Sequence, residues 1–179
     1  MVFARTSKGA SRISAQIRAH AFEKEYLAVV HGQPPAEAGT LRGLLVKDAS
    51  TGTSSAAAAG ESGKEAVLHY RLVSSKPDRQ AALLLVRLET GRAHQIRVQL
   101  AEAGCPVWQD ARYGGMVQGA GRDADACQGI ALFACRIRFA HPVTGTPMSF
   151  AALPPAMAPW SFFGDELSDG VPDVHGGTI

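Results

Sequence analysis

The side chains best suited to chemistry lie close together in the sequence: Arg92, His94, Gln95 and Arg97. An arginine presents a planar fork of donors that can grip a phosphate or a carboxylate at two points. Such a grip requires a backbone that holds the side chain still. These arginines could equally be solvated side chains of an ordinary strand, turn and helix, so the flanking residues have to be considered.

The residues around these polar side chains predict a strand, a sharp turn and a helix. The apolar run 81–88 is typical of a buried strand, and Thr90 and Gly91 interrupt it. Gly91 can adopt backbone angles closed to other residues, so we expect the chain to turn there. Helical spacing begins at His94, and Gly104 is a typical helix stop. The arginines are therefore predicted to project from a backbone that packing fixes.

The elements predicted before this stretch share regular apolar periodicity and clear stop signals. They are a helix over 10–21 capped by Thr6 or Ser7, and strands over 24–32, 40–45 and 65–73. The segment 48–63 is rich in Ser, Ala, Gly and Thr, which predicts a flexible surface loop between two strands. Lys76-Pro77-Asp78 then favours a turn into the strand 81–88.

Beyond the central helix, a polar loop is predicted over 117–128, followed by a hairpin with strands 130–139 and 147–152. The remainder from Pro154 is predicted to end in an acidic, glycine-containing tail that is disordered. The sequence has no internal repeats. Because helices and strands are mixed rather than alternating, we predict one α+β domain over 1–153 with a mainly antiparallel sheet and packed helices, then a tail over 154–179.

The charge distribution favours a polyanionic partner. The chain has 18 Lys and Arg and 16 Asp and Glu, a net charge of +2. Residues 160–179 hold 4 of the acidic residues and no basic ones, which leaves 18 basic and 12 acidic residues in 1–159, a net of +6. Many proteins have such a balance, so the charge supports a polyanionic partner without requiring one.

The cysteines and the hydropathy favour an intracellular protein that does not associate with membranes. Cys105, Cys127 and Cys135 are odd in number and follow no zinc-binding spacing, which is typical of reduced thiols. No apolar run reaches the length of a membrane span, and no apolar secretory segment follows Met1.

The stretch Thr-Gly-Arg-Ala-His-Gln-Ile-Arg-Val at 90–98 resembles the central motif of RluA-type pseudouridine synthases, which isomerise uridine in structured RNA. Further motifs occur in the order usual for that family. They are Lys24-x-Tyr26-x-Ala28, Gly63-Lys64-Glu65-Ala66 before Tyr70, Gly104-x-Pro106 with Asp110 and Tyr113-Gly114, Ala131-Leu132-Phe133-Ala134, Phe139-Ala140-His141-Pro142 and Pro147-Met148-Ser149-Phe150.

The resemblance covers residues 2–153 and departs from the family at Gln109, where glycine is usual, and at Phe133, where histidine is frequent. If position 109 needs a glycine conformation, Gln109 is expected to strain its turn.

The resemblance implies roles for particular residues. Arg97 would pair with the catalytic aspartate and hold the flipped nucleotide, and Tyr26 would stack on the uracil and could handle a proton. Leu132 would form an apolar wall beside the base. Arg92 and His94 would organise the loop or contact RNA phosphates. The expected partner is structured RNA, ribosomal or transfer RNA, and the family uses no metal and no cofactor.

The catalytic aspartate itself is the exception. In the family it lies in a His-Arg-Leu-Asp segment just before a strand that ends in Phe-Ala-x-Thr-Ser-Lys, and this chain begins at Met1-Val2-Phe3-Ala4-Arg5-Thr6-Ser7-Lys8. The sequence thus resembles the C-terminal two-thirds or so of the catalytic domain. A truncated product, an incomplete gene model and a degenerate paralogue would each give this pattern.

Three functions remain open on these grounds. The first is an RNA pseudouridine synthase that is inactive as this isolated chain. The others are a noncatalytic RNA-binding remnant, and a structural subunit that another chain completes. The sequence does not specify the RNA, the target uridine or the oligomeric state.

Overall fold

The computed structural model describes residues 2–115 and 129–171, and its centre is a sheet of seven strands. The strands lie in the order β3-β2-β4-β5-β1-β6-β7, and every neighbouring pair is antiparallel. They are β1 (Glu23–His31), β2 (Ala38–Lys47), β3 (Ser54–Ala56), β4 (Lys64–Lys76), β5 (Ala81–Leu88), β6 (Leu132–Ala140) and β7 (Pro147–Ala151). The predicted α+β class with a mainly antiparallel sheet is confirmed.

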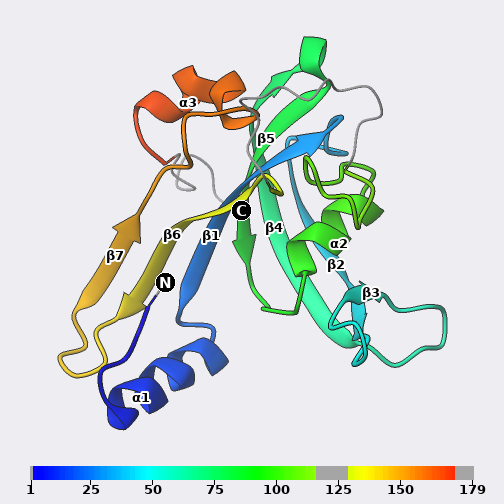
Figure 1. Cartoon of the computed structure of the whole chain (residues 1–179). Helices are drawn as coiled ribbons and strands as arrows, with labels where there is room; N and C mark the ends of the chain where they lie inside the picture. Colours follow the sequence, from blue (N-terminus) through cyan, green and yellow to red (C-terminus); the bar gives the residue numbers. More distant parts are fainter. Residues whose placement is uncertain (1, 116–128, 172–179) are drawn as a thin grey trace.

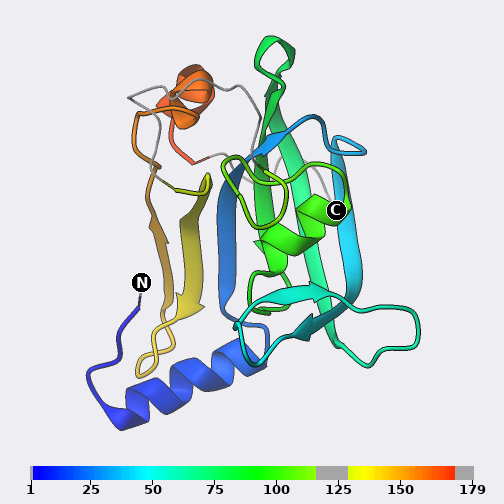
Figure 2. The same ribbon diagram turned by 45° about the vertical axis from the view of Figure 1, so that its right-hand side comes forward.

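The helical elements pack on both faces and at one end of this sheet (Figures 1 and 2). They are α1 (Ser7–Arg18), α2 (Gln95–Glu102), α3 (Gly164–Ser168) and the 3₁₀ turns η1 (Pro77–Arg79) and η2 (Trp160–Phe163). Thr6 caps α1, accepting the Gly9 N–H at 3.1 Å. Gln16 exchanges two hydrogen bonds with the backbone of Ala140, which fastens α1 to the end of β6.

Residues 81–86 of β5 and residues 27–30 of β1 are apolar because both of their faces are covered. Successive side chains of a strand point to opposite faces, so Ala28, Val30 and Val86 enter the core beneath α2. Leu27 and Val29 enter the core beneath η2 and α3. We call these two sides the α2 face and the α3 face.

The C-terminal segment is ordered further along the chain than a tail from Pro154 would suggest. Trp160, Phe163 and Leu167 are buried against the α3 face. Burial of large apolar side chains stabilises a segment whose overall composition is acidic and rich in glycine. The Glu166 carboxylate adds hydrogen bonds from Ser74 at 2.5 Å and Lys76 at 2.9 Å.

The segment 48–63 also differs from its prediction as a loop, because it contains β3, which pairs with β2. Its Ser- and Ala-rich sequence has little strand propensity of its own, so pairing with an existing strand is what orders it. The predicted polar loop at 117–128 lies outside the described residues. No helix in 2–115 or 129–171 is long and apolar enough to cross a membrane.

Candidate active site

The turn that leads into α2 is locked by two of its own side chains. The Thr90 hydroxyl accepts the Val67 N–H at 2.8 Å and donates to the Gln95 amide oxygen at 2.9 Å. The same Gln95 oxygen accepts the Arg92 N–H at 3.0 Å, and the Gln95 amide nitrogen donates to the Val67 carbonyl at 3.0 Å. Thr90 and Gln95 therefore fix the loop to β4, and the buried Gln95 amide has partners at both its oxygen and its nitrogen, as buried polar groups usually do.

The sequence had predicted the unusual backbone angles of this turn at Gly91, but the residue in the left-handed region is His94. His94 precedes α2 with φ of 53°, in the left-handed region. Its Nδ1 lies 3.0 Å from the Tyr113 hydroxyl, and the two rings meet edge to face.

Helix α2 is anchored to the sheet by Gln99. Its amide nitrogen donates to the carbonyls of Leu41 and Ala66, both at 3.1 Å.

Arg97 makes a two-point ion pair with Asp110. Its Nε lies 2.6 Å from Asp110 Oδ2 and an Nη lies 2.7 Å from Oδ1, and the carboxylate is fully buried. The Arg97 guanidinium also stacks over the Tyr113 ring, 4.9 Å from its centre. Burial alone would raise the pKa of Asp110, but the hydrogen bonds and charge of Arg97 outweigh it and hold that pKa below its usual value.

Two backbone features fix the loop that carries Asp110. Gln109 has φ of 60°, so the expected glycine-like conformation is present and a glutamine adopts it. A Cβ on Gly115 would lie 1.8 Å from the Val107 carbonyl oxygen, so no other residue fits there. The Asp110 carboxylate also accepts the N–H groups of Arg112 and Tyr113, at 3.2 and 3.3 Å. This carboxylate therefore has a structural place in its loop.

Strand β3 is joined to this cluster through Tyr113. The Tyr113 hydroxyl donates to the Ser54 carbonyl at 2.8 Å. Burial, followed by the charges of Arg97 and Arg112, lowers the pKa of His94. His94 is therefore mostly neutral at pH 7, and its ring organises the loop through Tyr113.

Tyr26 and Leu132 lie on the α2 face of the sheet. Tyr26 of β1 pairs with Ala134, and Ala28 pairs with Leu132, so both side chains point the same way. Both are half-buried against the core that contains Ile96 of α2. Burial raises the pKa of Tyr26, so its hydroxyl is protonated at neutral pH.

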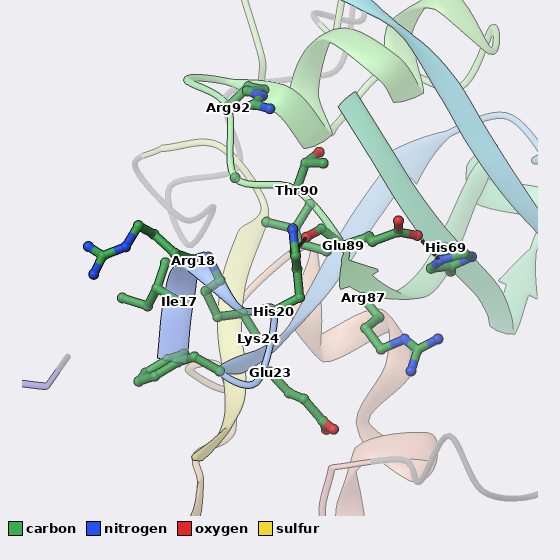
Figure 3. A pocket seen from close by; sticks show the side chains of 13 residues that line it. Ile17, Arg18, His20, Glu23, Lys24, His69, Arg87, Glu89, Thr90 and Arg92 are labelled. Carbon is green, nitrogen blue, oxygen red and sulfur yellow. Dashed lines mark hydrogen bonds and ion pairs between the residues drawn. The ribbon is translucent and has the colours of Figure 1, made fainter. Parts of the chain in front are cut away.

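Arg92 lies apart from that group. Its Nε donates to the Glu65 carbonyl at 2.9 Å, and it lines a pocket of about 470 Å³ between α1, β1 and the Thr90–Arg92 turn (Figure 3). Tyr26, Arg97 and Leu132 are not among the residues that line this pocket. Arg97 turns instead toward Asp110, in the loop beyond α2.

Comparison with known proteins shows the family of this chain. A family model described as RNA pseudouridylate synthase matches residues 1–102. The chain belongs to the RNA pseudouridylate synthase family. Ribosomal large subunit pseudouridine synthase D of Zymomonas mobilis is 32% identical over 154 residues, which are 85% of this chain and 48% of that protein. The corresponding protein of Xanthomonas campestris is 35% identical over 159 residues, 85% of this chain and 46% of that one. The chain thus spans about half the length of these relatives.

Solved structures agree on the fold. Human RNA Pseudouridylate Synthase Domain Containing 4 superimposes with a TM-score of 0.70 at 21% identity, covering 94% of this chain and 69% of that one. Human RNA Pseudouridylate Synthase Domain Containing 1 gives 0.65 at 18% identity, covering 95% and 76%.

Sequence reasoning missed two features of the site. It gave Asp110 a place in a motif but did not identify it as the partner of Arg97. It also quoted Lys24 in a motif without giving it a role, although Lys24 stands two residues before Tyr26 and therefore shares its strand face.

Proposed function

We propose that this chain functions as part of an RNA pseudouridine synthase, which isomerises uridine to pseudouridine in structured RNA inside the cell. The observation that carries the proposal is the family match over residues 1–102, which includes the whole Arg92–Arg97 stretch. Because the matched relatives are named as ribosomal large subunit enzymes, we propose ribosomal RNA as the substrate ahead of transfer RNA.

We propose that Tyr26 stacks on the flipped uracil and that Leu132 forms an apolar wall beside it. Their shared position on the α2 face supports this assignment. Flipping a base out of its stack costs about a few kcal/mol, and a half-buried aromatic ring can recover part of that cost. Arg97 would hold the nucleotide with the part of its guanidinium that Asp110 leaves available, and its side chain is 16% exposed.

The carboxylate that performs the chemistry is proposed to come from a His-Arg-Leu-Asp segment, which residues 1–179 do not contain. Asp110 is a poor substitute, because its oxygens are occupied by Arg97 and by backbone N–H groups. We therefore predict that residues 1–179 bind RNA but form no pseudouridine unless such a segment is supplied.

The test is to incubate the purified chain with ribosomal RNA and with transfer RNA, and to map pseudouridine by chemical labelling. A parallel sample carries the same chain joined to an N-terminal segment with the His-Arg-Leu-Asp motif. Product from the extended chain alone is the expected result. Product from residues 1–179 that disappears in Asp110→Asn would make Asp110 the catalytic carboxylate, and RNA binding without product from either sample would indicate a noncatalytic RNA-binding protein.

A further inference from the structure

The pocket beside Arg92 has four arginine or lysine residues, two histidines and two glutamates among the thirteen residues that line it. It lies where the end of α1, the start of β1 and the Thr90–Arg92 turn meet. Figure 3 shows Arg92 and Arg87 at opposite ends of the pocket, with His20 and Lys24 between them and Arg18 extending outward. Its ionisable lining residues are Arg18, His20, Glu23, Lys24, His69, Arg87, Glu89 and Arg92.

The carboxylates of this pocket already have partners. Glu89 lies 3.2 Å from His69, and Glu23 lies 3.3 Å from Arg138, which is outside the lining. The Lys24 ammonium group has no hydrogen bond or ion pair with any residue in the described part of the chain. The four arginine and lysine residues of the lining outnumber its two glutamates, so the pocket keeps a net positive charge.

Lys24 is held inside the pocket rather than extending into solvent. It is half-buried, and a Cβ built on Gly91 would lie 3.2 Å from its Nζ. A glycine at position 91 leaves room for that ammonium group. Removing an unpaired ammonium from water costs free energy unless an anion compensates for it. A half-buried lysine without a partner, at the centre of a basic pocket, is suited to bind an anion.

We propose that this pocket binds a backbone phosphate of the RNA substrate, with Lys24 as its central cation and Arg92 and Arg87 at its ends. The inference rests on the proposed function, because it adds a contact for the same RNA. Lys24 and Tyr26 lie on one strand face, about 7 Å apart along the strand. That separation is close to the spacing of successive phosphates, so the bound phosphate is one adjacent to the nucleotide that stacks on Tyr26.

The experiment measures binding of a short RNA stem-loop to the full chain at rising potassium chloride concentrations. Lys24→Gln is compared with Lys24→Arg, which keeps the charge, and with Lys8→Gln, which removes an exposed charge at the far end of α1. We expect Lys24→Gln to weaken binding about tenfold. The salt slope, which is the slope of log affinity against log salt concentration, should fall in magnitude by about one because one phosphate contact is lost. Lys24→Arg should retain most of the affinity, and Lys8→Gln should stay near wild type.

Stem-loops with one neutral methylphosphonate linkage at a time identify the phosphate. One of these stem-loops should bind the wild type more weakly than the unmodified RNA does. Lys24→Gln should bind that stem-loop and the unmodified RNA equally well. Inorganic phosphate is the second probe: competition at millimolar concentration would mean a site for free phosphate and would overturn the RNA assignment. Thermal unfolding of each variant shows whether weaker binding results from a loss of folding. If Lys24→Gln does not fold, the test is the affinity of Lys24→Arg, which should stay close to that of the wild type.

The outcomes for this pocket and for the proposed function are distinct. If the wild-type chain fails to bind RNA at low salt, the proposed function itself is wrong for this chain. If the wild type binds but Lys24→Gln has the same affinity and salt slope as Lys8→Gln, only the pocket is wrong. Gly91→Ala gives an independent check, because its methyl group would crowd Lys24 and should reduce affinity in the wild type but not in Lys24→Gln.

Discussion

Each face of the sheet carries an arginine–carboxylate pair, but the two pairs have different surroundings. On the α2 face, Arg97 binds Asp110 with its side chain 16% exposed, beside an aromatic ring and a polar loop. On the α3 face, Arg136 binds Glu25 at 2.8 Å, with side chains 9% and 2% exposed, and Arg138 adds a second contact to the same carboxylate at 3.0 Å. The first pair can still meet a ligand, whereas the second is enclosed.

A bulge in β6 creates the enclosed pair. Pairing with β1 steps from Glu25–Arg136 to Tyr26–Ala134, so Cys135 is an extra residue. With regular alternation Arg136 would share the α2 face with Ala134, and the bulge moves it to the face of Glu25. The Arg136 guanidinium then also reaches the Val171 carbonyl at 2.9 Å, which ties the C-terminal segment to the sheet. Two similar ion pairs thus serve different purposes: one positions a side chain and the other fastens the fold.

The largest effect should come from breaking the enclosed pair. Arg136→Met leaves the Glu25 charge buried with only Arg138, and we expect the free energy of unfolding to fall by about 3 kcal/mol. Urea denaturation measures it, with Arg138→Met, whose parent side chain is 27% exposed, as the milder control. RNA affinity of the folded fraction should not change. A cost below about 1 kcal/mol would mean that the α3 face does not depend on this pair.

Breaking the other pair should cost less stability but should affect binding. Asp110→Asn keeps the shape of the side chain and removes its charge, so Arg97 loses the group that orients it. We expect the free energy of unfolding to fall by about 2 kcal/mol and RNA binding to weaken several-fold. Asp78→Asn makes the same chemical change at a side chain that is 74% exposed, and it should alter neither quantity. Equal RNA affinity in Asp110→Asn and wild type would remove the distinction between the two pairs.

A smaller effect should appear in the pH dependence of stability. The folded state lowers the pKa of His94 from 6.5, so folding favours the neutral ring. The stability that this ring contributes is therefore fully present above pH 6.5 and is lost as the pH falls through the lower folded pKa. The loss should be on the order of 0.5 kcal/mol, because solvent screens the partly exposed ring. Thermal melts of wild type and His94→Asn, which tolerates the left-handed backbone, should converge toward lower pH. A constant difference across the range would exclude this titration.

The smallest effect concerns the loop that presents Asp110. Gln109→Gly relieves a left-handed backbone at φ of 60° but adds freedom to the unfolded chain. We expect a net gain of a few tenths of a kcal/mol, measured by urea denaturation, without a change in RNA affinity. A loss of stability would show that the Gln109 side chain contributes more than its backbone costs.

The central motif was readable from sequence because each of its signals is local. The apolar run 81–88 predicts β5, and Gly104 follows the end of α2 after Glu102, as expected. The turn between them was placed correctly but attributed to Gly91, whereas the left-handed residue is His94. The prediction failed because the hydrogen bonds of Thr90 and Gln95 to Val67, more than twenty residues away, select the backbone conformation.

The placement of two candidate site residues was predictable for the same reason. Tyr26 and Leu132 were named as candidates from their motifs, and strand alternation places them on one face. The partner of Arg97 and the isolation of Lys24 could not be named, because both depend on how a loop and a turn approach another element.

The sequence by itself determined the order of the elements, the apolar strands that form the sheet, and the positions of the polar residues in the central motif. These follow from periodicity, turn residues and motif spelling, which act over a few residues. Only the tertiary structure decided that Asp110 holds Arg97, that a bulge at Cys135 turns Arg136 toward Glu25, and that Trp160 and Phe163 order an acidic C-terminal segment. The physical reason is that burial and ion pairing depend on distances between segments far apart in the chain.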